Sequence, residues 1–341
     1  MSKASPKKPI ASLSLDMDNK WSYMKTHGDP GWDKFPTYLD TVVPRFLEVL
    51  RQRDLHMTVF VVGQDAAREE NFEAIRSIAD AGHEIGNHSF HHEPWLHLYS
   101  HEKLVREIAT TEEHLERVTG QCPIGFRGPG FSFTEDLLKI LIQRGYRYDA
   151  STFPTFLGPL ARLYYFMSTR LDQGQREERK ELFGQFSEGF RKLKPFEWKF
   201  DEGALTEIPV TTMPLFKVPI HASYVLYLAE YSEFVAKAYW KSALSMCRLF
   251  HVGPSLLLHP LDFMGKDDDS DLAFFPAMGS PGERKVELTA WMIDQMAKHY
   301  DVRPMKDHAD ALFPREIEGG NEICGNKASR VMPELTAAAR S

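Results

Sequence analysis

Short apolar segments alternate with longer amphipathic segments along most of this chain. The apolar segments fall near residues 10–18, 57–63, 83–86, 124–127, 146–148, 205–210 and 255–259. The segments between them carry helical spacing at 37–53, 70–81, 100–119, 134–144, 231–249 and 282–299. Strands that alternate with helices in this way indicate βα units around a parallel sheet. Half a dozen such units in succession favour a closed or nearly closed barrel over a two-layer sandwich.

The regular alternation is interrupted at about residues 153–204. We expect a largely helical insertion there, placed before the last strands. It holds an aromatic cluster, consisting of Tyr164, Tyr165, Phe166 and Trp198. Such residues can stack on sugar rings, touch a membrane surface or pack in a core or interface. We interpret residues 1–341 as one domain with a flexible tail over 317–341, because that tail is small and polar.

Charge and composition narrow the classes of function. The formal net charge of −7 argues against nucleic acid as a partner, which requires a basic surface. No apolar run approaches the ~18 residues of a transmembrane helix, and the basic N-terminus lacks the apolar stretch of a secretory signal. Cys122, Cys247 and Cys324 are widely spaced and odd in number, which is typical of reduced thiols. These features together predict a cytoplasmic protein.

The segment 82–92, Gly-His-Glu-Ile-Gly-Asn-His-Ser-Phe-His-His, carries the strongest chemical signal. His88 and His92 are four residues apart, so both imidazoles could bind one metal ion if the backbone there is helical. A catalytic metal usually takes a third protein ligand and keeps one position for water. We assign His83 and His91 to scaffold or hydrogen-bonding roles. The alternative for all of them is an ordinary surface or core position.

The first predicted strand ends in Asp16-Met17-Asp18. Residues two apart in a strand point to the same face, so both carboxylates project from its carboxyl end, which carries the chemistry of βα barrels. One carboxylate there can bind a metal while the other acts as a base. Asp18 with His88 and His92 makes the ligand set of a catalytic divalent site. Loop capping and solubility are the alternative roles for the two aspartates.

Two later strands also end in polar side chains. Arg127 follows the strand near 124–127, and a guanidinium there can hold a neighbouring carboxylate ionised and oriented. Pairing with a structural acid is the alternative. His259 ends a buried apolar run, where a titratable group costs desolvation energy unless it is paired. This position indicates a general acid, with a hydrogen-bonded core histidine as the alternative.

These segments together resemble the polysaccharide deacetylase family, also called carbohydrate esterase family four. The matching segments follow the order of the family and are Leu15-Asp16-Met17-Asp18, His88-Ser89-Phe90-His91-His92, Arg127-Gly128-Pro129, Tyr148-Asp149-Ala150-Ser151 and Leu257-Leu258-His259. The Asp-x-Asp spacing resembles the intracellular branch, which includes peptidoglycan-deacetylase-like and allantoinase-like members. The fourth segment departs from the family because it lacks the usual tryptophan.

The resemblance implies an α/β fold, a distorted (β/α) barrel with fewer than eight complete units. The roles that it implies are Asp18, His88 and His92 as metal ligands, Asp16 as general base, His259 as general acid, Arg127 orienting Asp16, and Asp149 supporting His259. A backbone N–H near Phe131 would hold the oxyanion of the reaction. We also expect His221 and Tyr224 to reach the substrate cleft.

The reaction implied is amide hydrolysis by metal-activated water, with an N-acetyl or similar acyl group leaving an amino-sugar-containing substrate. Two alternatives stay open. One is hydrolysis of a small non-peptide amide or cyclic ureide, as in allantoinase-like relatives, and the other is a non-catalytic glycan-binding barrel. The ligand types suit zinc, iron, cobalt and nickel alike, and availability favours zinc. Peripheral membrane contact and a homo-oligomer are also left open.

Overall fold

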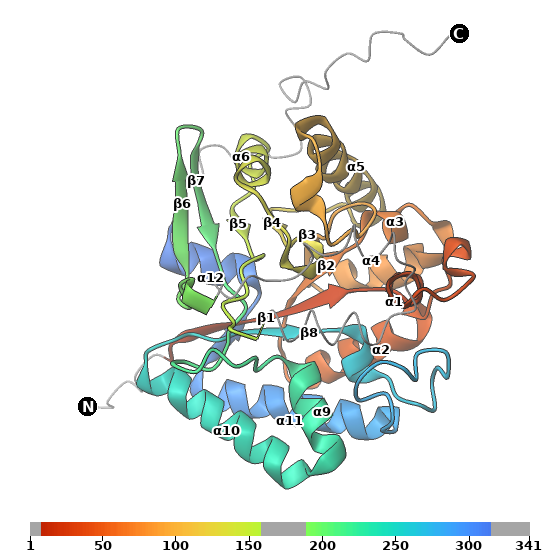
Figure 1. The fold of residues 1–341 in the computed structure, drawn as a ribbon, viewed down its shortest axis with the longest axis vertical. Coiled ribbons are helices and arrows are strands. Elements are labelled where there is room, and N and C mark those ends of the chain that lie inside the picture. The colour runs from red at the N-terminus through yellow and green to blue at the C-terminus, as the bar shows by residue number, and fades with distance from the viewer. Residues whose placement is uncertain (1–7, 158–188, 315–341) are drawn as a thin grey trace.

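The computed structural model of the chain describes residues 8–157 and 189–314 (Figure 1). A curved, mostly parallel sheet forms its centre, in the strand order β6-β7-β5-β4-β3-β2-β1-β8, with β9 pairing with β1. The strands are β1 (Ile10–Met17), β2 (Thr58–Val61), β3 (Glu84–Asn87), β4 (Gly125–Phe126), β5 (Tyr148–Asp149), β6 (Phe196–Phe200), β7 (Gly203–Glu207), β8 (Ser255–Leu258) and β9 (Asp301–Arg303). The helices are α1 (Lys20–His27), α2 (Leu39–Arg51), α3 (Gly63–Ala66), α4 (Phe72–Asp80), α5 (His101–Thr119), α6 (Glu135–Gln143), α9 (Ala222–Tyr231), α10 (Glu233–Leu249), α11 (Gly282–His299) and α12 (Met305–Leu312).

The sheet curls into a half-barrel whose margins are drawn together by an extended segment after β7. In that segment Ile208 N–H donates to Asp149 O at 2.9 Å, on the β5 side. Thr211 N–H donates to Ser255 O of β8 at 3.1 Å. The hydrogen bonds therefore continue from the β5 side across to β8, although β8 pairs with β1 in the regular sheet. This confirms the predicted α/β fold.

The helices form where apolar spacing and end signals agree. Helix α5 shows both, because Ser100 Oγ accepts a hydrogen bond from Lys103 N–H at its start and Gly120 takes the left-handed conformation at its end. A serine N-cap and a glycine just past the last turn satisfy backbone groups that the helix leaves unpaired. The buried face of α5 packs Ile108 and Leu115 against the core, and neither is exposed to solvent.

The predicted helical insertion at 153–204 is corrected where the structure describes it. Residues 196–200 form the strand β6, which makes an antiparallel hairpin with β7. Trp198 lies on this strand opposite Leu205 of β7, so pairing with β7 holds this short segment extended. Residues 158–188, which include Tyr164, Tyr165 and Phe166, lie outside the described residues, as does the tail 317–341.

Helix α12, which the sequence pattern did not predict, closes the amino end of the half-barrel. The N–H groups of Met305 and Lys306 donate to Thr58 Oγ1 at 2.8 Å and to Glu84 Oε2 at 3.0 Å. Thr58 and Glu84 are the first residues of β2 and β3. The side chain of Met305 then reaches inward, with its sulfur 3.5 Å from Nη2 of Arg127.

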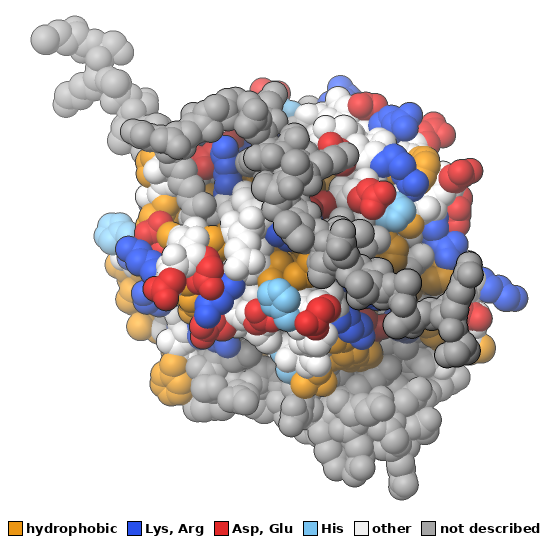
Figure 2. Space-filling view, turned by 90° about the horizontal axis from the view of Figure 1, so that it is seen from above, with side chains coloured by type: hydrophobic (Ala, Val, Ile, Leu, Met, Phe, Trp, Pro, Cys, Tyr) orange, Lys and Arg blue, Asp and Glu red, His pale blue; other side chains and the backbone are white. Residues whose placement is uncertain are grey.

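The surface charges and the helices bear on the kinds of partner that the sequence predicted. On the face in Figure 2, acidic and basic side chains of the described residues are interspersed. Within the same residues, every helix is too short or too polar to cross a bilayer.

Cys247 is free and buried, whereas Cys122 is disulfide-bonded, which corrects the expectation that all three thiols are reduced. The cytoplasmic location stays a prediction.

Candidate functional site

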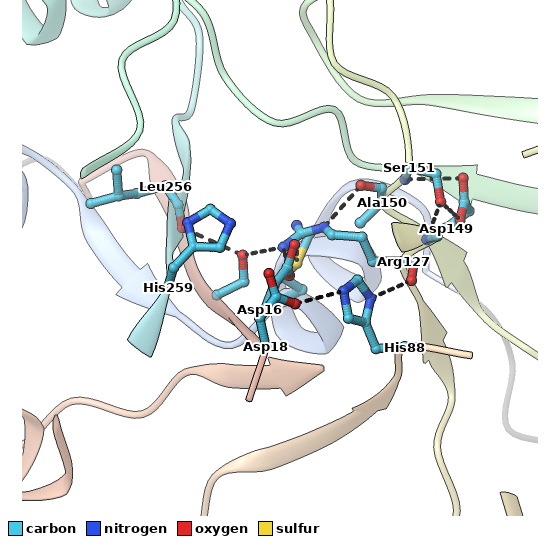
Figure 3. A network of polar contacts seen from close by, with 12 residues as sticks. Asp16, Asp18, His88, Arg127, Asp149, Ala150, Ser151, Leu256 and His259 are labelled. Carbon is cyan, nitrogen blue, oxygen red and sulfur yellow. Dashed lines mark hydrogen bonds and ion pairs between the residues drawn. The ribbon is translucent and has the colours of Figure 1, made fainter. Parts of the chain in front are cut away.

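Polar side chains from four strands meet at the carboxyl edge of the half-barrel (Figure 3). Parallel strands end at one edge, so residues distant in sequence become neighbours there. The residues at or just after these strand ends are Asp16 and Asp18 (β1), His88 (β3), Arg127 (β4) and His259 (β8). The sequence predicted each of them, and the structure places them on the same edge.

Asp18, His88 and His92 form the one group among the described residues whose donor atoms can converge on a metal ion. One donor atom of each lies within 4.8 Å of the other two. Oδ1 of Asp18 is 2.8 Å from Nε2 of His92 and 3.5 Å from Nε2 of His88. This Oδ1 atom is buried and faces the two imidazole nitrogens, so all three donor atoms point at one position. The predicted ligand triad is therefore assembled.

The two histidines do not meet on a helix, which was the condition that we attached to their spacing. Residues 88–92 form a loop in which Ser89 and His92 take positive φ angles of 60° and 54°. Asn87 and Glu107 hold this loop, because Asn87 Oδ1 accepts from Ser89 N–H at 2.9 Å. Oε2 of Glu107 accepts from the N–H groups of Phe90 and His91 at 2.9 and 3.0 Å. Side-chain hydrogen bonds to the loop backbone, and not a helix, therefore bring the two histidines together.

The histidines of the run have separate tasks. Nδ1 of His88 lies 2.6 Å from the carbonyl oxygen of Arg127, which leaves Nε2 free to face Asp18. Nδ1 of His91 pairs with Glu107 at 2.6 Å, and Nδ1 of His83 accepts from Met57 N–H at 3.2 Å. The scaffold roles predicted for His83 and His91 agree with these contacts.

The carboxylates and imidazoles of the site shift the pKa values of one another. Burial alone would raise the pKa of Asp18, but the imidazoles of His92 and His88 lower it well below the usual value. Burial would lower the pKa of His88, and the carboxylates of Asp16 and Asp18 raise it instead. The site thus favours a carboxylate at Asp18 and positive charge beside it, as a divalent cation would provide.

Arg127 lies beside Asp16, as the sequence predicted. Its Nη1 donates to Oδ1 of Asp16 at 2.6 Å and to Oγ of Ser14 at 3.0 Å. Its Nε donates to the carbonyl of Ala150 at 3.0 Å. The guanidinium is fully buried and lies over the ring of Phe60 at 4.4 Å. These contacts fix the orientation of Asp16 at the end of β1.

Asp149 does not lie next to His259, contrary to the role that the resemblance implied. Figure 3 shows the two residues at opposite ends of the network. Oδ1 of Asp149 accepts from Ser151 Oγ at 2.7 Å, and Ser151 Oγ accepts in turn from Gly128 N–H at 2.8 Å. Burial and the Asp149 carboxylate raise the pKa of Glu207, on β7, well above its usual value. Asp149 therefore shapes the loop after Arg127, in a buried acid pair with Glu207.

His259 has two partners that the sequence analysis did not identify. Oγ of Ser223, on α9, lies 3.3 Å from Nδ1 of His259. The acid nearest to this contact is Asp262, whose Oδ1 accepts from Ser223 Oγ at 2.8 Å. Proline at the first position of a helical turn and an acid at its third are typical N-terminal signals. The His259-Pro260-Leu261-Asp262 pattern could have revealed Asp262, whereas no local signal points to Ser223.

A series of aromatic rings connects the loop after Arg127 with His259. Phe131 stacks on Phe153 with centroids 4.7 Å apart, and Phe153 lies 5.8 Å from His221. His221 contacts Tyr224 at 4.4 Å and His259 at 5.8 Å, centroid to centroid. His221 thus contacts the predicted acid directly, whereas Tyr224 and Phe131 are connected to it through His221 and, for Phe131, also through Phe153, which the sequence did not single out. The backbone N–H of Phe131 donates to Gly128 O at 2.9 Å, so it is already engaged in a turn.

A comparison with known protein families matches a part of the chain that contributes to this site. Residues 29–148 match the family model described as polysaccharide deacetylase. This stretch contains His88, His92 and Arg127, whereas Asp16, Asp18 and His259 lie outside it.

Individual proteins resemble this chain over part of its sequence, and a solved structure resembles it over most of its length in fold. A peptidoglycan-N-acetylglucosamine deacetylase of Bacillus cereus is 32% identical over 103 residues, which cover 30% of this chain and 36% of that protein. A chitin deacetylase of Colletotrichum lindemuthianum is 33% identical over 95 residues, or 27% of this chain and 38% of that protein. The match thus spans little more than a third of either relative.

A solved structure assigned to the polysaccharide deacetylases, from Mycobacterium smegmatis, has a TM-score of 0.58 at 20% identity and covers 91% of this chain and 92% of its own. Residues 29–148 are thus similar to the polysaccharide deacetylase family, and the chain shares the fold of a solved structure assigned to it.

Proposed function

We propose that this protein is a metal-dependent hydrolase that removes an N-acetyl or similar acyl group from an amino-sugar-containing substrate. One observation carries the proposal: a metal-ligating triad stands beside the aspartate that Arg127 holds. A protein that only binds a glycan has no need of a base beside a metal site. Relatives named as peptidoglycan and chitin deacetylases support the same class of reaction.

The donor set fits a divalent cation. Two imidazole nitrogens and one carboxylate oxygen make a three-ligand set that leaves room for water. The contact from His88 Nδ1 to a backbone carbonyl is the outer-shell arrangement that orients a histidine ligand. We propose zinc, although iron, cobalt and nickel accept the same ligands. When bound, such an ion lowers the pKa of water and polarises the acyl carbonyl.

Acid–base chemistry is supplied by residues on either side of the triad. Asp16, oriented by Arg127, takes the proton of the attacking water. His259, in its protonated form, gives a proton to the amine that leaves. Each of these roles is worth roughly 10²–10⁴-fold in rate.

The aromatic rings beside His259 form one wall of the proposed substrate site. Rings of Phe153 and Tyr224 offer flat apolar faces, and such faces pack well against the apolar faces of sugars. Burial, followed by the charge of His259, lowers the pKa of His221 well below its usual value, so His221 is a neutral member of this wall. The N–H of Phe131 can stabilise the oxyanion only after releasing Gly128 O. We therefore propose that substrate changes this turn.

The spacing Asp16-Met17-Asp18 supports a place in the Asp-x-Asp branch of the family. That branch includes members that act on small ureides, so the substrate assay must include both classes. Zinc-loaded protein is given N-acetylglucosamine oligomers and, separately, allantoin. We expect acetate release from the oligomers and loss of that release in Asp16→Asn.

A matched control is Asp201→Asn, which makes the same change at an exposed residue of the β6–β7 turn. It should leave acetate release unchanged. Ring opening of allantoin without acetate release would instead establish the ureide alternative. Glycan binding with no turnover of either compound would establish a non-catalytic barrel.

A further inference from the structure

We propose that Ser223 and Asp262 form a relay that positions His259 as the proton donor of the hydrolysis. The hydroxyl of Ser223 lies between the two, 2.8 Å from Asp262 Oδ1 and 3.3 Å from His259 Nδ1. The inference rests on the proposed function and deepens it, because it names the residues that prepare the acid. It assigns them the task that the resemblance gave to Asp149.

Asp262 is held as a hydrogen-bond acceptor at both of its oxygens. Oδ1 accepts from Ser223 Oγ, and Oδ2 accepts from the backbone N–H of His259 at 2.8 Å. A protonated carboxyl group would need one oxygen as a donor, so these contacts fit the ionised form. The side chain is 1% exposed, and its own backbone carbonyl accepts from Thr289 Oγ1 at 3.2 Å. Asp262 is therefore a buried carboxylate fixed by the turn Pro260–Phe263.

The direction of the hydrogen bonds sets the tautomer of His259. Ser223 has one hydroxyl proton, and the carboxylate of Asp262 accepts it because it cannot donate. The oxygen of Ser223 therefore faces Nδ1 of His259 with a lone pair, which requires a proton on Nδ1. A neutral His259 then keeps Nδ1–H, and Nε2 is the nitrogen that gains and gives up the catalytic proton.

Charged groups from several elements face this relay. Burial raises the pKa of Asp262 above its usual value, although the positive charges of His259 and Lys285 oppose this increase. Lys285, on α11, is itself buried, which lowers its pKa to about 8, and Asp262 opposes that decrease. The other titratable groups nearby are Tyr23 on α1, His221 at the start of α9, Asp16 on β1, Asp18 just after β1, and Arg45 on α2, which pairs with Asp268.

The location of the relay also separates it from the acid pair. Asp149 and Glu207 interact across β5 and β7, on the far side of Arg127 from His259 (Figure 3). Ser223 belongs to the first turn of α9, and Asp262 follows β8. The acid that prepares His259 thus comes from the strand end that carries His259 itself.

Kinetics of three variants test the relay. Ser223→Ala removes the hydroxyl, and Ser223→Thr keeps it as the matched control. We expect Ser223→Ala to lower kcat about 10-fold with little change in KM, and Asp262→Asn to lower it about 100-fold. Ser223→Thr should retain the kcat of the natural protein.

A spectroscopic measurement tests the same relay without turnover. In the zinc-loaded full chain labelled with ¹⁵N-histidine, His259 is assigned by its loss in His259→Gln. We expect the Nδ1–H tautomer in the natural protein and the Nε2–H tautomer in Asp262→Asn, because the carboxamide can donate to Ser223, which then donates to Nδ1.

The two measurements separate this inference from the proposed function. If no acylated sugar is hydrolysed, the tautomer of His259 still tests the relay. An unchanged tautomer in Asp262→Asn would overturn the proposal. Equal losses of kcat in Ser223→Ala and Ser223→Thr would also overturn it, because the relay requires the hydroxyl and not the shape of the side chain.

Discussion

Nη1 of Arg127 lies 2.6 Å from Oδ1 of Asp16, and this contact joins two strand ends that are separated by β2 and β3 in the sheet. Both side chains are buried. A buried charge that loses its partner is strongly destabilising, by about 3–5 kcal/mol. The contact therefore links the orientation of the proposed base to the stability of the half-barrel.

Replacing Asp16 by Asn should separate catalysis from metal binding. We expect kcat for acetate release to fall about 10²–10⁴-fold, because the amide cannot accept a proton from water. The bound metal should stay, because Asp16 is not one of the three converging ligands. Acetate assays and elemental analysis measure the two effects, and near-normal turnover would show that Asp16 is not the base.

Removing the metal should lower the stability of the protein. A ligand that binds only the folded state at 100 times its Kd adds about 2.7 kcal/mol to the free energy of unfolding. Thermal unfolding with and without chelator measures this difference. It should vanish in Asp18→Asn, which removes the ligand charge, and persist in Asp201→Asn. A chelator effect of the same size in Asp18→Asn would contradict the ligand assignment.

Acid should destabilise the fold through His83. Burial lowers the pKa of His83 to about 4, and its Nδ1 accepts from Met57 N–H. The unfolded chain takes up a proton below pH ~6.5 that the folded chain refuses, so the free energy of unfolding falls by at most about 1.4 kcal/mol per pH unit as pH decreases from 6.5 to 4. His83→Gln can accept the same hydrogen bond without titrating. Denaturant unfolding across this range should show a smaller pH dependence in His83→Gln, and an equal one would exclude His83 as the cause.

The acid pair on β5 and β7 should destabilise the protein as pH rises. Burial and Asp149 raise the pKa of Glu207 well above its usual value, so the folded chain retains a proton that the unfolded chain loses above pH ~4.5. The free energy of unfolding therefore decreases from pH 5 upward until the folded group titrates. Glu207→Gln removes this loss, and we expect the variant to gain stability relative to the natural protein between pH 5 and 8. The exposed Glu202→Gln should show no such gain, and a gain of equal size there would refute the explanation.

Local sequence patterns were sufficient to predict most of the strands and helices around the site. Apolar runs and alternation predicted β1, β2 and β8 within a few residues of their bounds, because these strands are almost entirely buried. The hairpin strand β6 and helix α9 were missed. The strand β6 is only partly buried along its length, and α9 lies in a stretch whose spacing gave no helical prediction, so neither gave a periodic signal.

The sequence by itself determined which polar residues gather at one edge of the sheet, because parallel strands end at one edge. These residues, at or just after the ends of predicted strands, are Asp16, Asp18, His88, His92, Arg127 and His259. Tertiary structure alone decided how these groups are held. Asn87 and Glu107 shape the loop of the histidines, and Ser223 lies against His259 although 36 residues separate them. Such partners are set by packing between distant segments, which leaves no trace in local spacing. For the same reason the acid beside His259 is Asp262 and not Asp149.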